Sequence, residues 1–350
     1  MAIRRDDLLT RLEDLSLLRG IPGQEDEVRR YLAERLQGKV DLLERDALGN
    51  LIVGVGLQKK GPRVMLAAHM DEVGLLIHAI EENGLLRFRK VGGIDDRILL
   101  SKPVLVGPNR VPGVIGAKPI HLQEPGEREK AVSWREMAID IGARDKREAE
   151  AQVQVGQMAT FLTEFGPFGE NRVKGKAFDD RAGCTVLLSL LEEEWEGPLF
   201  GIFTVQEEIG LRGARTAAYR VDPHYAIVLE GTPAADIPRK EGETPSTELG
   251  KGPAISFMDR SSIAHPPMVK ELIEVAEREG IPWQWRRTQG GGNDAGAIHL
   301  TRAGVPSVSI SVPCRYIHTP VAVLDPEDLW HTVQLARAFT AELFKKGDRS

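Results

Sequence analysis

Apolar residues recur at helical spacing near both ends of the chain. Leu8, Leu12 and Leu15 lie three or four positions apart, and the stretch 326–344 repeats this spacing over a longer distance. Further amphipathic stretches predict helices at 24–36, 184–195, 211–219, 266–279 and 294–302. Each of these helices has one apolar face to bury.

Short runs of β-branched and aromatic residues lie between the predicted helices. They predict strands at 63–68, 199–205, 224–229, 283–286 and 305–312, and a hairpin formed by 40–43 and 51–55. Because strands and helices alternate, the predicted fold class is α/β, with helices packed on a sheet.

The pattern changes between residues 73 and 162, where short β-rich runs are interrupted by Gly and Pro. Strands are predicted at 74–80, 85–91, 103–106 and 111–115, with one helix at 146–151 and a polar loop at 123–134. We therefore predict a small β-rich domain at 73–162, inserted into a discontinuous α/β domain made of 1–72 and 163–350. Such insertions are tolerated when the ends of the insert lie close together.

Composition excludes several classes of protein. The 350 residues are 41% hydrophobic, which is enough for a full core, and the net charge of −6 comes from interspersed acids and bases without a basic stripe for nucleic acid. Cys184 and Cys314 form neither a disulfide framework nor a CxxC metal motif, which favours a reducing compartment. The start of the chain resembles no signal peptide and no apolar run is long enough to span a membrane, so we expect a cytoplasmic protein with no membrane partner.

Two adjacent acids, Glu207 and Glu208, follow the strand predicted at 199–205. Neighbouring carboxylates at the end of a buried strand repel each other and need either a cation or open water. Successive side chains of an extended chain diverge, so one carboxylate can bind a metal while the other faces a water molecule that the metal holds. Taken alone, such a pair is more often only a solvated strand end.

Other potential metal ligands also fall at the ends of predicted elements. His69 and Asp71 follow a buried strand, a spacing that lets the imidazole bind a metal while the carboxylate fixes the ring. Asp179 lies at a helix start, where an acid is also an ordinary N-cap, and Glu230 and His318 follow the strands at 224–229 and 305–312. Two imidazoles and three carboxylates are a suitable set for two divalent ions bridged by one carboxylate. The candidate ligands are His69, Asp179, Glu208, Glu230 and His318.

The glycine run at 290–292 is followed by Asn293 and Asp294. It lacks the Lys-Ser/Thr of a phosphate-binding loop and the spacing of a dinucleotide fingerprint. We predict a mobile loop beside the active site.

Five blocks of sequence, at 68–74, 178–181, 206–214, 230–232 and 315–320, closely resemble the tetrahedral (TET) aminopeptidase family of co-catalytic metallopeptidases. Some members of this family carry glutamyl-aminopeptidase or endoglucanase labels. The resemblance covers essentially the whole chain, including segments at 91–96 and 140–143 of the predicted insert.

The resemblance implies a mixed-sheet α/β/α metallopeptidase domain and a metal-dependent aminopeptidase that removes N-terminal residues from short peptides by means of a metal-activated water. By the family pattern, one ion is held by His69, Asp179 and Glu230, and the other by Asp179, Glu208 and His318. Both ions are expected to be Zn²⁺ or Co²⁺. The pattern also makes Glu207 the general base and Asp71 the residue that orients His69.

The resemblance further implies a cis peptide between Asp179 and Asp180, a PDZ-like insert that forms dimers, and assembly of these dimers into a tetrahedral dodecamer. Two positions depart from the family. Glu230 stands where many relatives have Asp, and Asn293 stands where relatives often have Thr. The effect of these departures on metal preference and specificity is left open.

Three alternatives to an aminopeptidase are kept. A glycosidase uses paired carboxylates but has no need of the two histidines. A deacylase or carboxypeptidase of the wider co-catalytic zinc group shares the ligands, whereas a catalytically silent scaffold has no physical need for Glu207. Spacing alone does not distinguish acidic, basic and neutral N-terminal residues as substrates.

Overall fold

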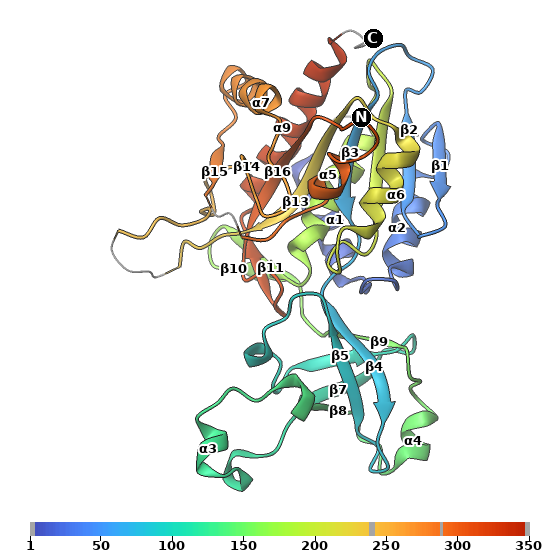
Figure 1. Cartoon of the computed structure of the whole chain (residues 1–350), viewed down its shortest axis with the longest axis vertical. Helices are drawn as coiled ribbons and strands as arrows, with labels where there is room; N and C mark the ends of the chain where they lie inside the picture. The colour runs from blue at the N-terminus through green and yellow to red at the C-terminus, as the bar shows by residue number, and fades with distance from the viewer. Residues whose placement is uncertain (1–3, 238–241, 288–289, 347–350) are drawn as a thin grey trace.

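The computed structural model describes residues 4–237, 242–287 and 290–346. In Figure 1 a large sheet covered by helices stands above a smaller barrel, and the chain passes from the sheet into the barrel and back. The predicted fold class is confirmed, because a mixed sheet with helices is accompanied by a separate closed antiparallel barrel. No helix in the described ranges is both long enough and apolar enough to cross a membrane.

The large sheet has eleven strands within the described residues, and its four central strands run parallel. Across the sheet they are β12 (Leu199–Thr204), β3 (Val64–His69), β13 (Tyr225–Pro233) and β16 (Ser307–Arg315). One edge continues with β2 (Leu51–Val55) and β1 (Leu42–Arg45), and the other with β17 (Ala322–Leu324), β11 (Arg172–Gly175) and β10 (Gly166–Phe168). The short β14 (Ala254–Ser256) and β15 (Gln284–Arg286) branch from β16. Parallel central strands bring their carboxyl ends to the same edge of the sheet.

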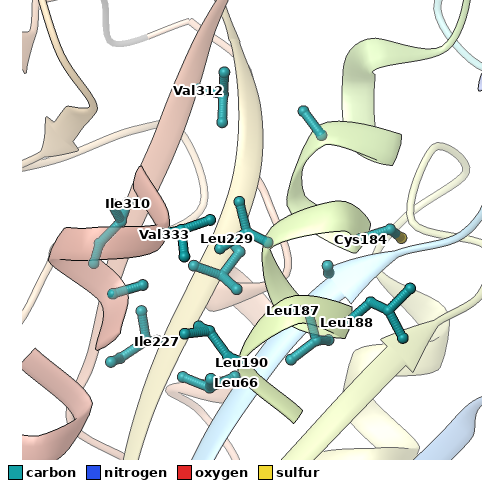
Figure 2. Packing of buried hydrophobic residues seen from close by; sticks show 14 of the residues in the cluster. Leu66, Cys184, Leu187, Leu188, Leu190, Ile227, Leu229, Ile310, Val312 and Val333 are labelled. Atoms are coloured by element: carbon teal, nitrogen blue, oxygen red, sulfur yellow. The ribbon is translucent and has the colours of Figure 1, made fainter. Parts of the chain in front are cut away.

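Helices cover both faces of this sheet, because alternate residues of each strand point to opposite sides. Leu66 and Ala68 of β3 belong to one core cluster, whereas Met65 and Ala67 belong to another. The first cluster includes residues of α1 (Arg5–Leu17), α2 (Asp26–Leu36), α5 (Phe178–Leu191), α7 (Pro266–Arg278) and α9 (Pro326–Phe344). The second includes residues of α6 (Arg212–Val221) and α8 (Ala295–Ile298). Figure 2 shows the leucines of α5 packed against the central strands.

The barrel has its own apolar core, which includes Leu75, Phe88 and Ile139. Its strands follow the closed order β4-β5-β8-β7-β6-β9. They are β4 (Gly74–Ile80), β5 (Leu86–Val91), β6 (Pro103–Val106), β7 (Val111–Gly116), β8 (Ala138–Asp140) and β9 (Met158–Phe161). The sequence pattern missed β8 and β9, since three or four residues are too few to show a period.

The predicted loop at 123–134 contains a short helix, α3 (Pro125–Arg128), in addition to the predicted α4 (Lys146–Glu150). A capping box starts α3: the Glu124 side chain accepts the backbone N–H of Glu127, and the Glu127 side chain accepts the backbone N–H of Glu124. Single 3₁₀ turns flank it at η2 (Ile120–Leu122) and η3 (Trp134–Glu136), and a third, η1 (Asp96–Ile98), follows β5. Polarity alone therefore missed one short helix in a segment that is otherwise irregular.

Two predicted boundaries near the sheet edge also differ from the structure. The strand predicted to end before Glu230 continues to Pro233, because β13 stays paired with β16 after its pairing with β3 ends at Val228. The helix predicted at 294–302 is only the four residues of α8, which Asn293 caps by accepting the N–H of Ala295.

Candidate metal centre

The candidate ligands gather at the carboxyl edge of the parallel strands. His69 ends β3, Glu208 follows β12, Glu230 lies inside β13, and His318 follows β16. Asp179 joins them from the first turn of α5. All five line one cleft of about 750 Å³, and Glu207 lines it as well. Residues that are far apart in the sequence therefore share one site.

Asp179 lies between the two histidines. Its Oδ1 is 3.2 Å from His69 Nε2, and its Oδ2 is 3.3 Å from His318 Nε2. A second carboxylate approaches the same nitrogen of each ring at 3.3 Å, Glu230 at His69 Nε2 and Glu208 at His318 Nε2. The donors thus form two groups that share one carboxylate, one oxygen for each group.

Both imidazoles direct Nε2 into the site because their Nδ1 atoms face carbonyl oxygens. His69 Nδ1 lies 2.9 Å from the carbonyl oxygen of Asp71, and His318 Nδ1 lies 3.1 Å from that of Gly93. A carbonyl oxygen only accepts a hydrogen bond, so it favours the tautomer with the proton on Nδ1 and leaves the Nε2 lone pair for a metal. Gly93 belongs to the barrel side of the cleft, so the barrel helps to orient His318.

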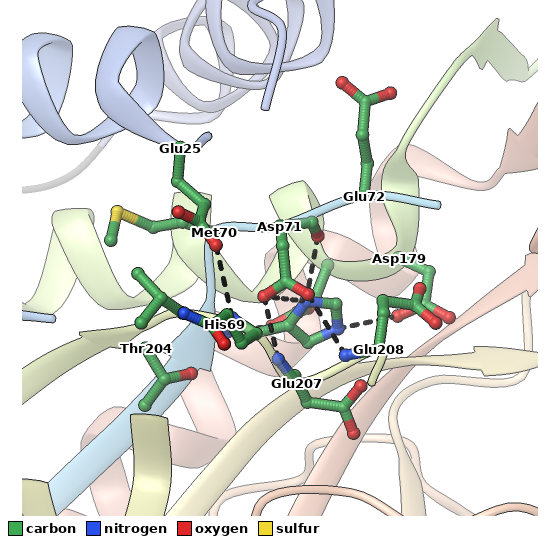
Figure 3. Close-up of polar contacts among 12 residues, drawn as sticks. Glu25, His69, Met70, Asp71, Glu72, Asp179, Thr204, Glu207 and Glu208 are labelled. Atoms are coloured by element: carbon green, nitrogen blue, oxygen red, sulfur yellow. Dashed lines mark hydrogen bonds and ion pairs between the residues drawn. The ribbon is translucent and has the colours of Figure 1, made fainter. Parts of the chain in front are cut away.

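The Asp71 side chain contacts the backbone of the two glutamates. Its Oδ1 accepts the N–H of Glu207 and its Oδ2 accepts the N–H of Glu208, both at 3.0 Å. Figure 3 shows this carboxylate between the His69 ring and the loop that carries the two glutamates. The nearest Asp71 carboxylate oxygen is 3.6 Å from His69 Nδ1, so the closer partner of the ring is the Asp71 carbonyl.

Asp180 supports the site from behind. Its Oδ2 accepts the N–H of His69 at 3.0 Å, and its Oδ1 accepts the N–H of Gly183 at 2.9 Å. The peptide between Asp179 and Asp180 is cis, as the sequence resemblance implied. Within the described residues, two sets of three ligand atoms lie close enough together to hold a metal ion: His69 with Asp179 and Glu208, and His69 with Asp180 and Glu230.

The glutamates of the site are buried among like charges. Burial raises the pKa of Glu208 and brings that of Glu230 to about 8. Burial also raises the pKa of Glu207 well above its ordinary value, and the charges of Glu230 and Glu208 add to this effect. Such a cluster favours the binding of positive charge.

The pKa values of the two histidines are also raised, although burial has the opposite effect on an imidazole. Burial alone would lower the pKa of His69, but the surrounding carboxylates raise it well above its ordinary value. Burial likewise opposes protonation of His318, and hydrogen bonds with Asp179 and Glu208 nevertheless raise its pKa to about 11. The same hydrogen bonds lower the pKa of Asp179 against the effect of burial. The imidazoles therefore lie in a strongly negative field.

Sequence reasoning missed three residues around the cleft. Glu25, at the start of α2, accepts the N–H of Gln206 at 3.3 Å and is almost fully buried. Asp294, which is 1% exposed, accepts a hydrogen bond from Thr204 Oγ1 at 2.5 Å. Arg286 ends β15 and lines the cleft. Of the three, only Asp294 could have been identified from the sequence, because it follows the glycine run.

Comparison with known proteins agrees with this arrangement. The family of M42 glutamyl aminopeptidases matches residues 49–335 of the chain. The chain belongs to this family. A putative aminopeptidase of Acetivibrio thermocellus is 38% identical, with 95% of this chain and 98% of that protein covered. Lysyl aminopeptidase of Pyrococcus furiosus (strain ATCC 43587 / DSM 3638 / JCM 8422 / Vc1) is 32% identical, with 93% and 94% covered.

Solved structures of the M42 family share the whole fold. The TET aminopeptidase of the marine sediment archaeon Thaumarchaeota archaeon SCGC AB-539-E09 is 37% identical with a TM-score of 0.92, over 97% of this chain and 98% of that one. The TET1 peptidase of Pyrococcus horikoshii, which can assemble into a tetrahedron or a large octahedral shell, is 35% identical with a TM-score of 0.86, over 96% and 100%. The resemblance inferred from motifs is thus confirmed. The chain is an M42 aminopeptidase, and the glycosidase alternative has no support.

Proposed function

We propose that this chain removes N-terminal residues from short peptides at a centre of two divalent ions, with Zn²⁺ and Co²⁺ as candidates. One ion would be held by His69, Asp179 and Glu230, and the other by Asp179, Glu208 and His318. The observation that carries the proposal is the position of Asp179, whose two oxygens face two different histidines at 3.2 and 3.3 Å.

The donor set fits divalent ions of this kind. Imidazole nitrogen and carboxylate oxygen are common zinc ligands, and a bridging carboxylate is a usual feature of two-metal hydrolases. Glu208 Oε1 is buried at 3.3 Å from His318 Nε2, and a buried carboxylate is costly unless positive charge lies beside it. Both Nε2 atoms face the carboxylate of Asp179, which lies between them.

In this proposal Glu207 is the general base. Its carboxylate lines the cleft, and its raised pKa suits a group that takes a proton from the attacking water and then gives it to the leaving amine. When bound, the ions supply Lewis-acid polarisation of the scissile carbonyl and a lowered pKa of the water. A free N-terminal amine carries a lone pair that a bound ion would accept, whereas an acetylated nitrogen does not, and this difference would account for selection of unblocked N-termini.

We also propose that residues 73–162 act as a dimerisation domain and that dimers assemble into a tetrahedral dodecamer. The proposal is supported by the closed barrel and by relatives that form tetrahedral shells. One solved structure, PhTET1-12s, is a dodecamer, and the TET1 peptidase of Pyrococcus horikoshii can assemble into a tetrahedron or a large octahedral shell. A cytoplasmic location is proposed on the basis of the two free, buried cysteines, Cys184 and Cys314.

The direct test is hydrolysis of aminoacyl-p-nitroanilides and short peptides by the purified protein. The protein is assayed as the apo form and after addition of Zn²⁺ or Co²⁺, with N-acetylated substrates as controls. We expect metal-dependent release from free N-termini only. Cleavage of the acetylated substrates would instead support the deacylase or carboxypeptidase alternative, and inactivity on every substrate would support the scaffold.

A further inference from the structure

The loop between α1 and α2 is bound to the barrel. Gln24 Nε2 donates to the carbonyl oxygen of Gly156 at 2.8 Å, and Gln24 Oε1 accepts the N–H of Met158 at 3.1 Å. Arg19 also reaches the barrel, because its Nη1 donates to the carbonyl oxygen of Gly107 at 2.6 Å. Since both ends of the Gln24 amide are bonded to the backbone at the start of β9, a shift of the barrel would move this loop as well.

Glu25, the next residue, contacts the active-site side of the molecule. It lies immediately before α2 and is 3% exposed (Figure 3). Its Oε1 accepts the N–H of Gly23 at 2.6 Å and the N–H of Gln206 at 3.3 Å. Gln206 directly precedes Glu207 in the segment 205–211, which we call the base loop. Two adjacent residues therefore connect the barrel with the base loop.

Capping of α2 does not explain the buried carboxylate of Glu25. Glu25 occupies the N-cap position, where a side-chain oxygen often accepts an N–H of the first helical turn, but its side chain makes no such bond. Burial raises the pKa of this carboxyl, and the nearby charge of Asp71 adds to the effect. An acid that is kept at such an electrostatic cost, and that binds the base loop instead of its own helix, indicates a positioning role.

We infer that Glu25 is a positioning residue for Glu207, and that Gln24 makes this positioning depend on the barrel. The inference rests on the proposed function, in which Glu207 is the general base. The base loop turns at Gln206, whose φ is 57°, and an unbonded amide at this turn would allow other loop conformations. A general base acts only within hydrogen-bond reach of the water that it deprotonates, so a small shift of the loop lowers the rate.

The test is a double-mutant cycle between Glu25 and Glu207 on the metal-loaded, full-length enzyme. Glu25→Ala removes the acceptor of the Gln206 N–H. We expect kcat for an aminoacyl-p-nitroanilide to fall by about 10- to 100-fold, with KM changed by about twofold or less. In the Glu207→Gln background, Glu25→Ala should lower kcat by about twofold or less, because the base through which it acts is already absent. The metal content should be the same in all four proteins.

Further variants separate positioning from a general structural effect. Glu25→Gln should restore most of the lost kcat, because one carbonyl oxygen can accept both N–H groups that Oε1 accepts. Gln24→Ala should lower kcat by about three- to tenfold, and adding it to Glu25→Ala should cause no further loss. The same cycle with Gln24→Ala keeps the inference testable if Glu25→Ala does not fold. Glu34→Ala, which removes an exposed acid of α2, is the control and should leave kcat unchanged.

Equal losses of kcat in the two backgrounds would show that Glu25 does not act through Glu207, and would overturn the inference while leaving the proposed function intact. Loss of metal in Glu25→Ala would also overturn it, because Glu25 would then support the ligands instead of the base. An unchanged kcat in Gln24→Ala would overturn the dependence on the barrel. The proposed function fails separately, if the wild type cleaves no free aminoacyl substrate or if Glu207→Gln is as active as the wild type.

Discussion

The carboxylate of Asp71 accepts the backbone N–H of Glu207 at 3.0 Å. Its other oxygen accepts the next N–H, that of Glu208, and Glu25 accepts the N–H of Gln206. Three successive amides are therefore held by two buried acids. Because Gln206 has a left-handed backbone with φ of 57°, this short segment turns sharply, and the acids compensate its unpaired amides. The position of the proposed base thus depends on residues that never face the cleft.

Asp71→Asn should lower kcat more than it changes KM. An asparagine side chain has one carbonyl oxygen, so it can accept only one of the two amides and places an NH₂ group against the other. We expect kcat to fall by about 10- to 100-fold, as for other residues that orient a catalytic group. Steady-state kinetics on a preferred aminoacyl-p-nitroanilide measures this effect. An unchanged kcat would mean that the loop keeps its position without Asp71.

The adjacent glutamates should behave differently when each is changed to glutamine. Glu207→Gln keeps the shape of the side chain and removes the base, so kcat should fall by about 10²- to 10⁴-fold while both ions stay bound. Glu208→Gln should instead weaken the binding of one ion. Metal content by mass spectrometry, measured beside kcat, separates the two outcomes. Loss of metal in Glu207→Gln would contradict its assignment as the base.

The sequence predicted the donor cluster because four of the five donors follow or lie near the end of a strong strand pattern, and the fifth, Asp179, lies at a helix start. His69 and Glu208 come directly after buried apolar runs, and such runs meet at one sheet edge in any parallel arrangement. Glu25 and Arg286 could not be predicted in this way. Their partners, Gln206 and Gly290, are set by loop conformations that no periodicity records. The barrel strands β8 and β9 were missed for a different reason, because three or four residues are too few to show a period.

Asp179→Ala and His318→Ala should differ in metal stoichiometry. Asp179 contacts both histidines, so its removal should abolish the tight binding of both ions. Among the candidate ligands, His318 contacts Asp179 and Glu208, which belong to one proposed ion site. Its removal should therefore leave the other ion bound. Calorimetric titration of the apo protein with Zn²⁺ gives the number of ions that each variant binds. Equal stoichiometry in the two variants would rule out a bridging role for Asp179.

Gly93→Ala should weaken the ion held by His318. A Cβ at this position would lie 3.2 Å from His318 Nδ1, which is close enough to displace the ring or its carbonyl partner. We expect the affinity for one ion to fall by about 10- to 100-fold, the usual effect of disturbing the partner of a histidine ligand. Competition with a chelator measures this affinity. Gly116→Ala is the control, because a Cβ on that barrel glycine meets no atom within 4 Å. A similar loss of affinity in both variants would contradict the specific role of Gly93 and would mean that any change in the barrel weakens metal binding.

Lys176→Met tests a buried ion pair behind the site. Lys176 Nζ donates to both Glu72 carboxylate oxygens, at 2.7 and 2.9 Å, and to the carbonyl oxygen of Leu18 at 2.7 Å. Burial lowers the pKa of this lysine from 10.5 to about 8, even though Glu72 opposes the shift. Between these pH values the unfolded chain keeps a proton that the folded chain has lost. The free energy of unfolding therefore rises with pH in this window.

Because the pKa of Lys176 falls from 10.5 to about 8 on folding, the free energy of unfolding of the wild type should rise by about 3 kcal/mol between these pH values. The methionine variant lacks this rise. Relative to Lys176→Met, the wild type should thus become more stable by this amount between pH 8 and pH 10.5. Urea unfolding followed by tryptophan fluorescence measures both proteins at the two pH values, with Lys270→Met, an exposed position of α7, as the control for loss of a lysine. A constant difference between wild type and Lys176→Met across this range would mean that Lys176 keeps its proton when the chain folds.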